Sequence, residues 1–171
     1  MTKNKVPILR FYWDSCVFLS AINGNPDRTP IIKAILEDCE EGNVEIYTSM
    51  LSITEVAFAE TEKASNILDS EVENNIDALW LPPSPIKLIE IHEFILRDAK
   101  KLMRLAVEKG FSLKPADAIH LTTAQRIELN EIHTYDPKWL KYQDLVKHKI
   151  KEPNTERLPF PVEDDKAKPK E

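Results

Sequence analysis

Short apolar runs alternate along this chain with longer stretches in which apolar residues recur every three or four positions. Three of the runs, over residues 8–13, 44–47 and 131–134, have the length and composition of buried strands. A fourth candidate strand covers residues 86–89, directly after prolines that end the preceding pattern.

Helical spacing of apolar residues fills the segments between these runs. It predicts helices over residues 16–22, 31–41, 51–63, 67–79, 91–109 and 115–129. Gly110 suits the position just after a helix, and Pro115 suits the first turn of the next one. A short helical turn is expected after Pro137.

Strands that alternate with helices predict an α/β fold with a mostly parallel sheet. The 171 residues are enough for one domain with a real core, which we place at residues 1–150. Residues 151–171 then form a C-terminal extension. Its last part, 161–171, is rich in Pro, Lys, Glu and Asp and is expected to be a largely disordered tail.

Charge and hydropathy narrow the range of functions. The net charge of -6 argues against broad, phosphate-driven binding to nucleic acid, although it allows a local basic groove beside an acidic site. The sequence has no apolar stretch of about 20 residues, so no membrane span is expected. The first ten residues lack the apolar run of a signal peptide, and we therefore expect a cytoplasmic protein.

The cysteines and histidines point to no zinc site. Cys16 and Cys39 are too few for a disulfide framework, and we interpret both as buried small hydrophobic residues. The four histidines form no HExxH motif, and no Cys/His cluster has the spacing of zinc ligands.

Four acidic residues each have an ordinary structural explanation. Asp14, just after the first strand, suits a helix N-cap, and Asp136, at the end of another strand, suits a turn. Glu55 completes a Ser-x-x-Glu capping box. Asp117 lies in the first turn of a helix, where the helix dipole favours an acid.

The shared placement of the four acids suggests a common site. Asp14 and Asp136 follow predicted parallel strands, whereas Glu55 and Asp117 lie near the starts of helices. In an open α/β sheet these positions share the edge at which ligands bind. Four carboxylates there would repel one another unless a pKa rose or a cation intervened. Mg²⁺ or Mn²⁺ suits such an all-carboxylate site.

Four segments around these acids resemble the motifs of PIN domains. They are residues 11–15 (FYWDS), 48–56 (TSMLSITEV), 113–124 (LKPADAIHLTTA) and 132–136 (IHTYD), of which the third is the most specific. Their order and approximate spacing match over roughly residues 8–145. The resemblance implies a PIN-like three-layer fold with a mostly parallel central sheet flanked by helices.

The resemblance also implies an activity. Many PIN domains hydrolyse RNA phosphodiester bonds with Mg²⁺ or Mn²⁺, and this chain is most similar to VapC-type toxins of toxin-antitoxin pairs. Carried over, Asp14, Glu55, Asp117 and Asp136 become the catalytic, metal-binding acids. Asp14 and Asp117 would be direct ligands, and Glu55 and Asp136 would orient bound water or hold a second ion. Such toxins are commonly dimers and are blocked by an antitoxin, so both are candidate partners.

Further features of the sequence refine this expectation. Ser15 and Thr134 become groups that support the acids. Residues 61–85 form a longer segment than compact toxins have, and the tail after Phe160 is extra. One alternative is a catalytically silent PIN-fold module that binds RNA or protein. Another, a phosphatase with a DxD nucleophile motif, is disfavoured because Asp14 is followed by Ser and Cys.

Several other residues have two interpretations each. Asp98 lies near the core side of its helix and either points toward the acids or lies at the surface. His120, one turn after Asp117, either contacts an acid or phosphate or is a buried structural residue. Trp13 and Tyr135 either stack on a base or pack in the core. A set of cations forms either an RNA path or a solvated face: Arg97, Lys100, Lys101, Arg104, Lys109 and Lys114.

Overall fold

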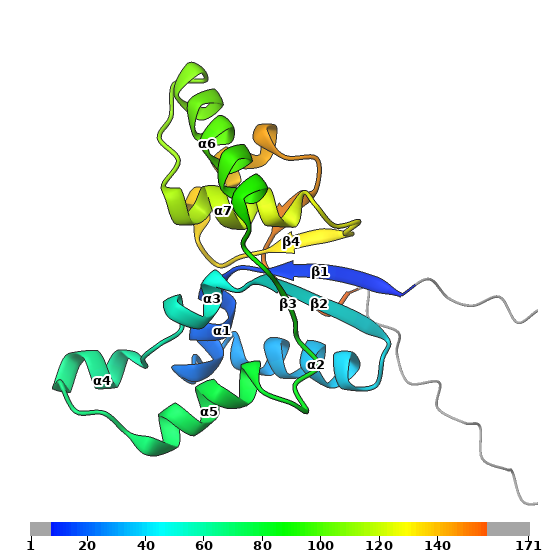
Figure 1. Cartoon of the computed structure of the whole chain (residues 1–171). Coiled ribbons are helices and arrows are strands. Elements are labelled where there is room, and N and C mark those ends of the chain that lie inside the picture. The colour runs from blue at the N-terminus through cyan, green and yellow to red at the C-terminus, as the bar shows by residue number, and fades with distance from the viewer. Residues whose placement is uncertain (1–7, 157–171) are drawn as a thin grey trace, which may run out of the picture.

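The computed structural model describes residues 8–156, in which a parallel sheet forms the middle layer (Figure 1). Its strands are β1 Leu9–Trp13, β2 Val44–Ser49, β3 Lys87–Ile89, β4 Glu131–His133 and β5 Lys149–Lys151. Their order is β3-β2-β1-β4-β5, and all neighbouring pairs are parallel. The α/β fold predicted from the sequence is confirmed, including the candidate strand at residues 86–89.

Helices cover both faces of this sheet (Figure 1). They are α1 Ser15–Ile22, α2 Thr29–Glu40, α3 Leu51–Glu55, α4 Glu60–Ser65, α5 Ser70–Trp80, α6 Glu93–Glu108, α7 Pro115–Ala124 and the 3-10 helix η1 Pro137–Leu145. A hydrophobic core lies on each face of the sheet. Strand β1 contributes side chains to both cores, because successive side chains of a strand point to opposite faces. Phe11 and Trp13 pack with α1 and α2, whereas Tyr12 packs with α6, α7 and η1.

The strand order places a topological switch point between β1 and β4. The chain builds the sheet outward from β1 to β3 and then returns to place β4 on the other side of β1. At such a point the connections leave a crevice beyond the carboxyl ends of the two strands. The arrowheads of β1 and β4 in Figure 1 point to the side where α1, α3 and α7 begin.

Three helix boundaries differ from the prediction. The single helix expected over residues 51–63 is wrong, because it is broken into α3 and α4. Glu62 stabilises the start of α4, because its buried carboxylate accepts hydrogen bonds from the backbone N–H groups of Ala59 and Asp69. The next helix begins only at Ser70, with Asp69 as its N-cap. The helix from Pro115 ends at Ala124 rather than at residue 129.

Strand β5 is absent from the sequence-based prediction. It has three residues, too few for a period of two to be visible, and it pairs with β4 through residues 149–151. The expected tail at residues 161–171 lies outside the described residues. Within residues 8–156, no helix is both long and apolar enough to cross a membrane.

Candidate active site

Two of the four predicted acids lie at the switch point between β1 and β4. Asp14 follows β1 and caps α1, since its Oδ1 accepts the N–H of Ser15 at 2.8 Å. Asp136 follows β4 and caps η1, since its Oδ1 accepts the N–H of Lys138 at 2.9 Å. The capping explanation of each acid therefore holds. The backbone of Asp14 also donates to the carbonyl of His133 at 3.0 Å, which keeps the two strand ends together.

The Asp14 carboxylate is fixed by side chains from both strand ends. It is 7 % exposed, and its Oδ2 accepts from the Thr134 hydroxyl and the Cys16 thiol, each at 2.9 Å. Cys16 also accepts the N–H of Tyr135 at 3.1 Å. Burial, together with the Asp14 charge, holds the pKa of the Cys16 thiol well above its usual range. The thiol is thus a neutral donor to Asp14.

The cysteine predictions are half right. Cys39 is buried in the core beside α2, as predicted. Cys16 is partly exposed and bonds polar groups, so its interpretation as a buried small hydrophobic residue is wrong.

Asp117 faces the two strand-end aspartates from the first turn of α7. Its Oδ1 accepts the indole N–H of Trp139, on η1, at 3.3 Å. Burial raises the pKa of Asp117, and the charges of Asp14 and Asp136 raise it further. The structure therefore brings three of the four predicted acids into electrostatic contact.

Glu55 belongs to an adjoining cluster. It is the last residue of α3 rather than an early one, and its carboxylate caps no helix, so the capping-box interpretation is wrong. Its Oε2 accepts from the Ser15 hydroxyl at 2.5 Å and from Nε2 of His120 at 2.6 Å. Burial opposes the charge of Glu55, but these two hydrogen bonds outweigh it and lower the pKa. Ser15 joins the two clusters, because its backbone binds Asp14 and its side chain binds Glu55.

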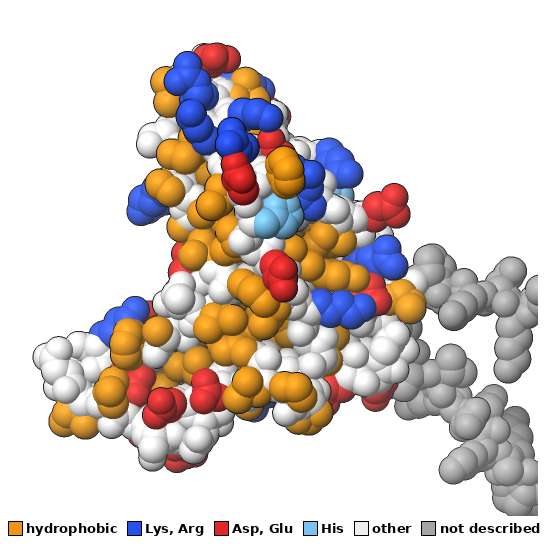
Figure 2. Space-filling model, in the orientation of Figure 1, with side chains coloured by type: hydrophobic (Ala, Val, Ile, Leu, Met, Phe, Trp, Pro, Cys, Tyr) orange, Lys and Arg blue, Asp and Glu red, His pale blue; other side chains and the backbone are white. Residues whose placement is uncertain are grey.

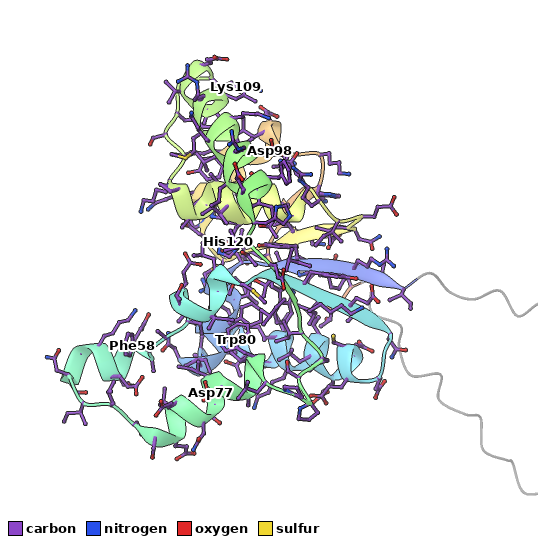
Figure 3. The ribbon with its side chains drawn as sticks, viewed as in Figure 1. Phe58, Asp77, Trp80, Asp98, Lys109 and His120 are labelled. Atoms are coloured by element: carbon purple, nitrogen blue, oxygen red, sulfur yellow. The ribbon has the colours of Figure 1, made fainter. Side chains whose placement is uncertain are left out.

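His120 is held in one orientation by a buried hydrogen-bond chain. The N–H of Ser49 donates to the Tyr12 hydroxyl at 3.0 Å, and that hydroxyl lies 2.8 Å from Nδ1 of His120. Burial, with the Asp14 charge, keeps the pKa of Tyr12 well above its usual range, so its proton is available to Nδ1. His120 then carries its own proton on Nε2 and donates it to Glu55. Both interpretations of His120 therefore hold: it is 1 % exposed, and it binds an acid. His120 lies where α7 meets the sheet (Figure 3).

The acids offer the oxygen donors that a hard cation prefers, but their side chains are not arranged as a complete metal site. Within residues 8–156, no group of three or more His, Cys, Asp or Glu side chains is arranged so that it could hold a metal ion. The donors that do gather here are carboxylate oxygens on neighbouring aspartates that disfavour one another's charge. Oxygen donors of net negative charge are what Mg²⁺ and Mn²⁺ take, so the chemistry of these residues fits such an ion.

A cavity of about 360 Å³ opens beside Asp117 and Asp136. Its lining combines the two acids with lysines and aromatic rings: Phe111, Ser112, Lys114, Asp117, Asp136, Lys138, Lys141 and Tyr142. We call it the lysine cavity. The sequence had singled out only Lys114 among its cations.

The other candidates lie elsewhere. Asp98 binds Lys101 and Arg126 and lines a separate cavity between α6 and α7, which supports its surface interpretation. Trp13 is fully buried and Tyr135 is 7 % exposed, so both pack in the core.

Comparison with known proteins shows the family of this chain. The family model of the PIN domain matches residues 11–145. The chain belongs to the PIN domain family. No curated protein sequence matches it.

Solved structures of two toxin-antitoxin complexes and of one toxin share the fold of this PIN domain. VapBC2 from Rickettsia felis, bound to a promoter DNA fragment, has a TM-score of 0.63 at 15% identity, over 84% of this chain and 98% of that one. FitAcB from Neisseria gonorrhoeae has a TM-score of 0.58 at 15% identity, over 84% and 97%. VapC20 from Mycobacterium tuberculosis, a toxin that cleaves the sarcin-ricin loop, has a TM-score of 0.58 at 11% identity, over 78% and 95%.

Proposed function

We propose that this PIN domain is a ribonuclease that uses Mg²⁺ or Mn²⁺ to hydrolyse RNA phosphodiester bonds. The observation that carries the proposal is the meeting of Asp14, Asp117 and Asp136 at the switch point between β1 and β4, where burial and like charge raise the pKa of Asp117. A bound cation would relieve this repulsion, and carboxylates with shifted pKa values are often found at functional sites.

In this proposal the four acids have different roles. Asp14 and Asp117 hold the ion, while Asp136 and Glu55 orient the water that attacks the phosphate or share a second ion. When bound, a divalent ion neutralises the scissile phosphate and makes water a better nucleophile. Thr134 and Cys16 keep the Asp14 carboxylate in place, and Trp139 does the same for Asp117. His120 and Ser15 keep Glu55 ionised and aimed at the site.

The biological setting we propose is a toxin-antitoxin pair. The supporting observation is the fold shared with VapBC2 and FitAcB, whose structures are complexes. An antitoxin protein and a second copy of the chain are the proposed partners.

A cleavage assay tests the enzymatic proposal. The full chain should cut a single-stranded RNA with Mg²⁺ or Mn²⁺ and stop when EDTA is added. Asp14→Asn and Asp117→Asn should each lower the rate by about 100-fold or more, since each removes a charged oxygen ligand. Asp98→Asn is the matched control and should cleave like the parent, because Asp98 lies with Lys101 and Arg126.

Two outcomes would contradict this function. Equal activity in EDTA would exclude metal-dependent hydrolysis. Binding of RNA without cleavage, over a broad panel of RNAs and both metals, would favour the catalytically silent binding module instead.

A further inference from the structure

Three lysine side chains line the lysine cavity. Lys114 precedes α7, and Lys138 and Lys141 lie on η1. Within residues 8–156, none of their ammonium groups forms a hydrogen bond or an ion pair, although Asp117 and Asp136 line the same cavity. The acids and the lysines are thus available to different ligands.

Two of the α6 cations that the sequence suggested as an RNA path form ion pairs. Figure 2 shows Lys and Arg side chains gathered over α6. Arg97 pairs with Glu93 on the same helix, and Lys101 pairs with Asp98. No residue of α6 lines the lysine cavity. The lysines that share a cavity with Asp117 and Asp136 therefore lie on η1 and before α7.

Two aromatic rings give this cavity an apolar wall. The rings of Phe111 and Tyr142 have centroids 5.9 Å apart at an interplanar angle of 37°. Tyr142 is 5 % exposed and donates its hydroxyl proton to the carbonyl of Ser112 at 3.2 Å, so its ring is fixed. Phe111 is partly exposed and leaves its edge or face available to a ligand.

We propose that the lysine cavity binds the nucleotide next to the scissile phosphate of a single-stranded RNA. Lys114, Lys138 and Lys141 hold the flanking phosphates, and the partly exposed ring of Phe111 takes the base. A volume of about 360 Å³ is enough for one such unit, at the small end of ligand pockets. Lysines along a backbone with aromatic rings for the bases are the usual means of binding single strands. The inference rests on the proposed function, because it places the RNA relative to Asp117 and Asp136.

Paired lysine substitutions test the inference. The variant Lys138→Gln with Lys141→Gln loses two charges of the cavity, and Lys33→Gln with Lys63→Gln loses two exposed charges on α2 and α4. Binding of a fluorescein-labelled 12-nucleotide RNA is measured by anisotropy in the Asp14→Asn background with Mg²⁺, so that the RNA is not cut. The cavity variant should raise Kd about tenfold and reduce the slope of log K against log salt by about 1.4, that is, by two phosphate contacts. The control variant should keep the Kd and the slope of the parent.

Cleavage by the same lysine variants, with Asp14 intact, separates this inference from the function. In that assay the cavity variant should mainly raise KM. If the parent cleaves RNA while KM and Kd of the cavity variant are unchanged, or if the control loses as much affinity, the inference is overturned and the ribonuclease function stands. If the parent binds RNA through these lysines but never cuts it, the ribonuclease function fails and the cavity remains a binding site. A parent that neither binds nor cuts RNA would overturn both.

Discussion

At the residue scale, Asp117 shows the conflict between stability and function most clearly. Burial and the charges of Asp14 and Asp136 raise the pKa of Asp117 in the folded protein. A carboxyl group with a raised folded pKa stabilises the fold while it is protonated, and that contribution is lost as the pH rises through the folded pKa. The ionised Asp117 is therefore destabilising at neutral pH when no cation is bound.

Removing this charge should stabilise the metal-free protein. We expect Asp117→Asn to have a higher thermal midpoint than the parent in EDTA at pH 7, and the difference should disappear at low pH, where the parent is protonated. Adding Mn²⁺ should raise the midpoint of the parent but not that of the variant. Scanning calorimetry with and without Mn²⁺ measures both effects. A parent more stable than the variant in EDTA would show that the three acids do not repel one another.

The hydroxyl of Tyr12 is the second residue-scale determinant. Tyr12→Phe leaves the N–H of Ser49 and Nδ1 of His120 without partners, which should cost about 1–3 kcal/mol of stability. His120 is then free to change tautomer and stop donating to Glu55. Loss of such a supporting group should lower kcat about 10-fold or more with little change in KM.

The control for Tyr12 is Tyr47→Phe, on the neighbouring strand. Tyr47 donates its hydroxyl proton to Glu45, so this variant also loses one side-chain hydrogen bond, but away from His120. Equal kcat values for the two variants would show that Tyr12 has a purely structural role, whereas a lower kcat for Tyr12→Phe alone would support its positioning of His120.

At the scale of elements, the sequence predicts the strands and most helices because their apolar periods are long and regular. The acids at the ends of β1 and β4 follow from the same reasoning, since parallel strands end at one edge. The hydrogen-bond partners of these acids do not follow from the sequence pattern. Trp139 lies 22 residues beyond Asp117, on a 3-10 helix that the sequence indicates only as a short turn, and the contact depends on tertiary packing.

The break between α3 and α4 shows why local patterns failed at Glu55. Ser52 and Glu55 have the spacing of a capping box, yet the Ser52 hydroxyl binds Thr48 and Ser15, and Glu55 binds His120. The real box-like contact is formed at Glu62, which accepts the N–H of Ala59. Long-range partners, which the sequence pattern does not contain, decide between the two.

Strand β4 carries a buried ion network that makes stability depend on pH. Glu131 is 2 % exposed, and the hydrogen bond from His133, followed by that from Lys151 on β5, lowers its pKa to about 2 although burial opposes its charge. With a folded pKa below the unfolded one, Glu131 stabilises the protein above about pH 4.5, and this stabilisation is lost as the pH falls toward 2.

Glu131→Gln should therefore be destabilising at pH 7, by about 3 kcal/mol, and should have a flatter loss of stability between pH 5 and about 2. Urea unfolding over this pH range measures the free energy of unfolding. Glu45→Gln is the comparison. Glu45 also has a pKa of about 2, but its ion-pair partners Arg10 and Lys87 are exposed, so burial is what distinguishes Glu45 from Glu131. Its loss should cost less than about 1 kcal/mol and depend on salt. Equal costs for the two variants would contradict the role given to burial.

At the scale of the whole molecule, the charge is unevenly distributed. The net charge is -6, yet cations gather over α6, whereas acids are prominent over α4 and α5 (Figure 2). Three further lysines line the lysine cavity. The net charge predicts that no broad surface binds phosphate, and it allows a local basic groove. The fold decides which lysines form a local basic groove. Lys114 and Lys141 are distant in the sequence, and both line the lysine cavity because η1 packs beside α7.

The domain boundary at residue 150 stays a prediction. Strand β5 runs to Lys151 and pairs there with His133, so the described sheet extends one residue past that boundary. Any shortened chain designed to test it should keep β5.

The central claim is that Asp14, Asp117 and Asp136 share a divalent ion. A crystal of the full chain soaked in Mn²⁺, with diffraction recorded for anomalous signal, tests it most directly. The account predicts a peak about 2.0–2.2 Å from the carboxylate oxygens of Asp14 and Asp117, absent from the Asp117→Asn crystal. An ordered site with no such peak, or with Mn²⁺ bound only away from these residues, would contradict it.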